Sequence, residues 1–219
     1  MAVVLVDNVS MGLTDPASAA PDIARAEKLV DRALAASPRH AFAHFVKGHV
    51  LRAQNRVDEA ILEYEAAFGL NPNLVVALLG LAWCKLYTGS IEGVIPIEEQ
   101  AIRLSPRDPS IGFCYHMIGT VHLLQSRTDE AIVWFEKARS AMPTQPFPRS
   151  RLASAYALRG EMERAAAELA EARRLHSGDL FSSITRLKAY PGGWLGVPKI
   201  RTLWEATYFA GLRKAGMPE

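Results

Sequence analysis

The chain has 219 residues, of which 49% are hydrophobic and 22% are charged, and its net charge at pH 7 is +2. This length suffices for one or two domains, and the composition excludes a disordered chain, which would have fewer apolar residues and a higher net charge. Acidic and basic residues are interspersed along the chain. Because no basic stripe is present, we expect no nucleic-acid partner.

The cysteines and the apolar runs bear on the compartment. Cys84 and Cys114 form no Cys-x-x-Cys pair, which favours two buried thiols in a reducing compartment over a disulfide-bonded secreted domain. The apolar run at residues 2–6 has no basic flank and is too short for the core of a signal peptide. No other run is long enough to span a membrane. We therefore expect a cytoplasmic protein without a membrane segment.

The first predicted unit covers residues 2–40. We predict its first helix in residues 2–13 and a long turn at 14–22, where the sequence reads TDPASAAPD. A second helix follows, with Ala26, Val30 and Ala33 on one face. It ends before Pro38, because proline cannot continue a helix.

From residue 41 onward, a pattern of two helices recurs. The sequence RVDEAILEYEAA at 56–67 returns as RTDEAIVWFEKA at 127–138, and prolines stand at positions 38, 72, 106 and 143. The predicted breaks between the two helices of successive units are at Asn55, Gly89, Ser126 and Gly160. Neither helix of a unit can bury its apolar stripe alone, so the units must stack on one another.

These landmarks divide the chain into about five units, at 2–40, 41–74, 75–108, 109–145 and 146–178, and a tail at 179–219. Three extra residues, Pro109 to Ile111, are predicted to add a turn to the N-terminus of the next helix. Beyond Pro198, the apolar residues of the tail approximate one face of a helix: Ile200, Leu203, Trp204, Tyr208, Gly211 and Leu212.

The repeated pattern resembles the tetratricopeptide repeat. Gly48, Ala82, Gly119 and Ala153 match the small residue of the family's first helix. The small-large-small set of its second helix is present as Ala60, Tyr64, Ala67, as Ala131, Phe135, Ala138 and as Ala165, Leu169, Ala172. At the first bulky position Leu78 and Tyr115 fit but His44 and Arg149 depart, and Val94 and Glu98 depart in the third unit. The resemblance covers residues 22–178 and implies an all-α, right-handed superhelical stack of antiparallel helix pairs with a C-terminal capping helix.

The resemblance also implies a binding surface, since in this family the first helices line a concave groove that binds segments of other proteins. Carried onto this chain, the groove positions are mostly apolar and aromatic: Phe42, Phe45, His49, Arg52, Val76, Leu79, Trp83, Tyr87, Phe113, His116, Met117, Thr120, Phe147, Ser150, Arg151 and Ser154. Family members that hold a peptide's C-terminal carboxylate use Lys, Asn and Arg here, and only Arg52 and Arg151 fit that set. We therefore predict an apolar protein or peptide segment as the partner.

Three roles stay open for the tail. It caps the last unit, or residues 199–213 fold back into the groove, or it contacts another chain. The ending ATYFAGLRKAGMPE at 206–219 is similar to the C-terminal, repeat-containing part of bacterial class III adenylate/guanylate cyclases, although no residues here match their catalytic domain. The alternative function is therefore a regulatory or oligomerisation module of such a protein. The excess of arginine over lysine agrees with a bacterial source.

The sequence gives no argument for an enzyme or a cofactor. Asp58-Glu59 and Asp129-Glu130 recur in the first turn of second helices, where negative charge complements the helix dipole. The glycine-rich YPGGWLG at 190–196 lacks the lysine and the strand-to-helix context of a phosphate loop. The histidines near residue 40 (His40, His44 and His49) come without an acidic or cysteine neighbour that would complete a metal site. We predict no catalysis, no cofactor and no metal.

Overall fold

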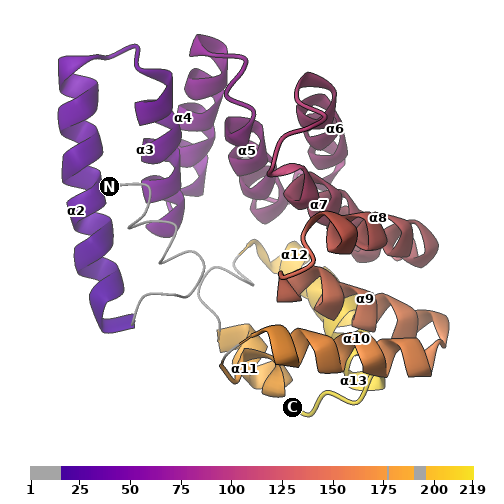
Figure 1. The fold of residues 1–219 in the computed structure, drawn as a ribbon. Coiled ribbons are helices and arrows are strands. Elements are labelled where there is room, and N and C mark those ends of the chain that lie inside the picture. The colour runs from indigo at the N-terminus through magenta and orange to yellow at the C-terminus, as the bar shows by residue number, and fades with distance from the viewer. Residues whose placement is uncertain (1–15, 177, 190–195) are drawn as a thin grey trace.

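The computed structural model describes residues 16–176, 178–189 and 196–219. Every regular element in these ranges is a helix, and Figure 1 shows the helices arranged one after another in a curved stack. The first helix predicted in residues 2–13 lies outside the described residues. The buried apolar core of the described residues runs along the stack, in one cluster near its N-terminal end, a small one between α5, α6 and α7, and a larger one that includes the tail.

The helices follow one another in antiparallel pairs. The stack begins with α2 (Pro16–Ala36) and continues with α3 (Ala41–Ala53) and α4 (Val57–Leu70), α5 (Val76–Tyr87) and α6 (Val94–Leu104), α7 (Ile111–Leu124) and α8 (Thr128–Ala141), and α9 (Pro146–Arg159) and α10 (Met162–Leu175). A short 3-10 turn, η1 (Ile91–Gly93), precedes α6. The tail contains η2 (Leu180–Ser182), α11 (Ile184–Ala189), α12 (Pro198–Trp204), a π-helical turn η3 (Glu205–Phe209) and α13 (Ala210–Lys214).

The four predicted breaks share one backbone geometry. Asn55, Gly89, Ser126 and Gly160 all have a positive φ, between 59° and 91°. In each case the next residue donates its backbone N–H to a carbonyl five positions earlier, as Arg56 does to Leu51 and Glu161 does to Tyr156, both at 2.9 Å. This is the Schellman ending of a helix, which satisfies carbonyls that the helix leaves open. It turns the chain at the same point of each pair.

Small residues on first helices let large residues on second helices enter the stack. The ring of Tyr64 lies against Gly48 of its own unit and Gly80 of the next, so that a Cβ placed on either glycine would come within 2.7 Å and 2.4 Å of it. Phe135 lies in the same way against Gly119. Both aromatic rings are fully buried. The small and large positions expected from the repeat pattern therefore meet in the fold.

The departures at the first bulky position are compensated 19 residues later. His44 Nδ1 lies 2.6 Å from Glu63 Oε2, and Arg149 donates a hydrogen bond of 3.0 Å to Glu168. In the fourth unit the equivalent pair is aromatic, with the rings of Tyr115 and Trp134 at 5.8 Å. The position thus joins the two helices of a unit, through a polar pair in the second and fifth units and through an aromatic pair in the fourth.

The third unit departs at the position that Tyr64 and Phe135 occupy elsewhere. Glu98 is 1% exposed, and the thiol of Cys114 on the next unit donates a hydrogen bond to it. Its Oε2 has no hydrogen-bond partner in the described part of the chain. Burial disfavours the charged form and raises the pKa of Glu98 to about 8. A protonated acid therefore takes the place of an aromatic ring.

Two local predictions were wrong. Residues 16–22 are the beginning of α2 and not a turn, because their alanines favour a helix and Pro16 suits its first position. Pro109 and Ser110 do not extend α7, which begins at Ile111. The N–H of Ser110 donates instead to Asp108 Oδ1 at 2.8 Å, so a side-chain turn takes up the extra residues.

Candidate binding surface on the concave side

The four first helices α3, α5, α7 and α9 carry the predicted groove positions, and the structure gives these side chains very different exposures. Phe42 and Phe113 are 47% and 43% exposed. His49, Arg52, Val76, Leu79, Trp83 and Phe147 are partly buried. The remaining predicted residues are buried, and they are Phe45, Tyr87, His116, Met117, Thr120, Ser150, Arg151 and Ser154.

Aromatic rings form a connected row at the N-terminal end of this surface. Phe45 contacts Phe42 with ring centroids 5.6 Å apart and His49 at 4.5 Å. Further along, Trp83 contacts Tyr87 at 5.7 Å. Burial, followed by the charge of Arg52, lowers the pKa of His49 to about 3. This histidine is therefore neutral at physiological pH and serves as an aromatic surface.

Tyr87 interacts electrostatically with residues from both ends of the surface. Burial raises the pKa of its hydroxyl, while the guanidinium groups of Arg52 and Arg151 lower it. Those arginines belong to α3 and α9, and the whole of the third and fourth units lies between these helices in the sequence. The positive charges of two distant first helices therefore act on the same hydroxyl.

The tail covers the C-terminal end of the surface. The hydroxyls of Ser150 and Tyr208 are 2.9 Å apart, and Ser154 donates a hydrogen bond of 2.9 Å to the carbonyl of Tyr208. The guanidinium of Arg151 lies over the rings of Tyr208 and Trp204, at 3.8 Å and 4.4 Å from their centroids. The tail therefore folds back onto α9.

The start of the tail helix is fixed at the middle of the stack. The N–H of Val197 donates to the carbonyl of Tyr87 at 2.9 Å. From there α12, η3 and α13 follow α7 and α9, as the yellow segment of Figure 1 shows. The tail thus lies over the buried groove positions of the fourth and fifth units.

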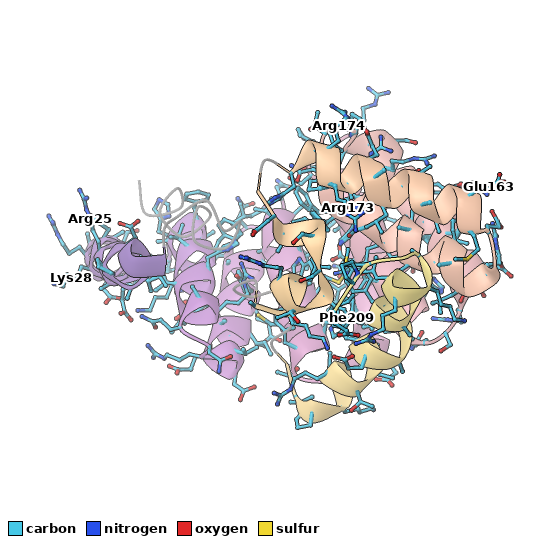
Figure 2. The ribbon with its side chains drawn as sticks, turned by 90° about the horizontal axis from the view of Figure 1, so that it is seen from below. Arg25, Lys28, Glu163, Arg173, Arg174 and Phe209 are labelled. Carbon is cyan, nitrogen blue, oxygen red and sulfur yellow. The ribbon has the colours of Figure 1, made fainter. Side chains whose placement is uncertain are left out.

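Sequence reasoning missed two residues of this contact. Thr207 and Phe209 are buried although they lie off the predicted helical face. The π-helical turn over Glu205–Phe209 changes the register, so that neighbouring residues both point inward. The ammonium group of Lys188 on α11 lies 4.9 Å from the centroid of the Phe209 ring, whereas Arg25 and Lys28 project from α2 in Figure 2. No signal in the sequence marks this turn.

The three histidines near residue 40, which were considered as metal ligands, make separate contacts within the fold. His40 accepts the N–H of Ala43 at the start of α3, His44 pairs with Glu63, and His49 packs on Phe45. Among the described residues, no group of three His, Cys, Asp or Glu side chains is placed to hold a metal ion. None of the described helices is long and apolar enough to cross a membrane.

Fold and surface together define an all-helical solenoid of the tetratricopeptide type. Residues 17–74 match the family described as tetratricopeptide repeat. Anaphase-promoting complex subunit 7 of Dictyostelium discoideum is 34% identical over 77 residues, which cover 35% of this chain and 13% of that protein. The chain therefore matches a small part of this relative's length.

Solved structures support the same fold over nearly the whole chain. A thermophilic TPR protein of Thermus thermophilus has a TM-score of 0.63 at 20% identity, covering 95% of this chain and 99% of that one. PilF of Pseudomonas aeruginosa has a TM-score of 0.67 at 17% identity, covering 98% and 89%. A chain of an APC/C hetero-tetramer has a TM-score of 0.70 at 14% identity, covering 98% and 38%. These similarities show the fold alone.

Proposed function

We propose that this protein is a non-catalytic scaffold that binds an apolar segment of another protein on its concave side. One observation carries the proposal. Phe42, Phe113 and Phe147 occupy equivalent positions, and the ring of Phe147 is covered by Phe181 of the same chain at 5.6 Å. Its equivalents Phe42 and Phe113 remain about half exposed. Large aromatic side chains at the edge of a concave surface are typical of protein-binding sites.

The test replaces these two exposed rings by a charge. We expect Phe42→Glu and Phe113→Glu to reduce capture of the partner at least tenfold with little loss of stability. Leu62→Glu and Val133→Glu are matched controls, because these residues are 66% and 51% exposed on the second helices α4 and α8. Capture followed by quantitative mass spectrometry compares the four variants. Partners that bind all four equally would exclude this surface.

A variant at the centre of the surface extends the test. Trp83 is partly buried and packs against the core and against Tyr87. Trp83→Glu should abolish partner binding while helical content, followed by circular dichroism, is retained. Unchanged binding would remove Trp83 from the proposed site.

The alternative function is a regulatory or self-association module of a class III cyclase-like protein, and it rests on the similarity of residues 206–219 to such proteins. In the structure, most of this ending packs against α9. Self-association through the tail would therefore require its release. Analytical ultracentrifugation of the chain with and without residues 199–219 tests this reading, and a strict monomer in both forms would argue against it.

A further inference from the structure

The contact between the tail and α9 uses features that a mere covering of apolar surface does not need. Tyr208 contributes its ring to Arg151, its hydroxyl to Ser150 and its carbonyl to Ser154. In each contact, a polar side chain of α9 meets a different part of the same tail residue, Tyr208. Arg151 is 3% exposed, so its stacking on aromatic rings takes place away from water, where cation–π contacts are strongest.

Gly211 fixes how closely the tail helix approaches. A Cβ at this position would lie 2.2 Å from the Ser154 hydroxyl and 2.4 Å from the Ser154 carbonyl oxygen. Because the second atom belongs to the backbone of α9, no side-chain rotation could relieve the overlap. The surface therefore accepts a helix only if a residue without a side chain stands at this point.

We propose that the surface of α7 and α9 beneath the tail is a binding site for an amphipathic helix of a partner protein, and that residues 198–214 are its built-in competitor. The partner helix carries two aromatic residues four positions apart, as Trp204 and Tyr208 are, and a glycine three positions further on, as Gly211 is. This inference rests on the proposed scaffold function and names both the class of partner and its regulation.

The tail sets a threshold for partner binding. A segment joined to its site through a short connection has an effective concentration on the order of millimolar. A free helix with the same contacts therefore competes poorly. A partner that also covers the exposed rings of Phe42 and Phe113 gains the additional contact needed to displace the tail. The exposed rings and the surface beneath the tail would then bind the same partner.

The experiment uses the full chain with Gly211→Leu, which should expel the tail. Hydrogen exchange of residues 198–214 reports the release. Gly69→Ala is the matched control, because no atom lies within 4 Å of the added Cβ. The probe is a labelled synthetic peptide of residues 197–219, and its binding is measured by fluorescence anisotropy. We expect it to bind the Gly211→Leu chain at least tenfold more tightly than the wild-type chain or the control.

Two further variants keep the test decisive. A peptide that itself carries Gly211→Leu should not bind, because its side chain would meet Ser154. If the Gly211→Leu chain loses its circular dichroism signal, Tyr208→Ala takes its place, since it removes the contacts to Ser150 and Arg151 without adding bulk. We expect peptide binding by the Tyr208→Ala chain to lie between those of the wild-type and Gly211→Leu chains.

Either of two results would overturn the inference. The first is failure of the peptide to bind a chain whose tail is released. The second is concentration-dependent dimerisation of the wild-type chain by exchange of tails, which would make a second copy the ligand in place of a partner helix. Both results are independent of the scaffold test, because that test depends on Phe42 and Phe113 and not on peptide binding beneath the tail.

Discussion

The second and third units have the same backbone plan but place their polar groups in opposite positions. In the second unit, the pair that joins the helices is polar, His44 with Glu63, and the residue that enters the stack is the aromatic Tyr64. In the third unit, the joining residues Leu78 and Ile97 are apolar, and the entering residue is Glu98. The repeat geometry therefore does not depend on the residue at any one of these positions. It depends on the shared turns and on the small residues that allow close approach.

The largest expected effect on stability comes from Glu98, the polar residue that distinguishes the third unit from the second. Its pKa is about 8 in the folded chain against an ordinary value of 4.5, so between these values the folded chain holds a proton that the unfolded chain has lost. Relative to the Glu98→Gln variant, the wild-type chain should lose on the order of 3 to 5 kcal/mol of stability as the pH rises from about 4.5 to 8. The difference between the two chains isolates Glu98, because the lowered pKa of His49 acts in the opposite direction and equally in both. Urea unfolding at pH 5 to 8 measures both chains, and equal slopes would contradict the assignment.

The glycine that receives Tyr64 gives the next largest effect. Gly48→Ala places a methyl group 2.7 Å from a buried ring, and overpacking of this kind costs about 2 to 3 kcal/mol. The third unit already has Ala82 at the equivalent position, where the slimmer Glu98 takes the place of the ring. Gly48→Ala should therefore cost much less in a Tyr64→Leu background. A double-mutant cycle by thermal unfolding measures this coupling, and additive effects would count against direct contact.

The joining pair can be compared between the second and the fifth unit. Glu168 is buried and binds both Arg139 and Arg149, whereas Glu63 is more exposed and binds His44. Glu168→Gln should cost about 2 kcal/mol because it leaves two arginines near the core without their acid. Glu63→Gln should cost about 1 kcal/mol or less. Chemical denaturation of the two variants tests the order, and an equal loss would contradict it.

The smallest effect concerns the titration of His44. Burial lowers its pKa, but its hydrogen bonds with Glu63 and the carbonyl of Pro38 outweigh that effect and raise it. The stabilisation is therefore complete below pH 6.5 and is lost as the pH rises through the pKa of the folded chain, with a size below about 1 kcal/mol. In the Glu98→Gln background, the difference in stability between the chain with His44 and the His44→Gln variant should follow this pH dependence, because His49 contributes equally to both chains. A difference that does not change with pH would contradict the assignment.

Much of the fold was predictable because each signal for it is local. The positive φ at Asn55 and Gly89 follows from turn residues set within a helical pattern, and the meeting of Gly48 with Tyr64 follows from the spacing of small and large residues. The start of α2 and the turn before α7 were predicted wrongly. A proline can stand either in a turn or in the first turn of a helix. Pro16 was assigned to a turn but begins α2, and Pro109 was assigned to a helix but precedes α7.

The sequence by itself determined the paired helices from residue 41 onward and the positions of the turns within each pair, because periodicity and turn chemistry act within a few residues. Only the tertiary structure decided which of the predicted groove residues remain exposed. Phe147 is covered by Phe181, and Arg151 is covered by Trp204 and Tyr208, through contacts between residues far apart in the sequence. Such contacts depend on how the curved stack and a π-helical turn bring distant surfaces together, and no local pattern encodes that.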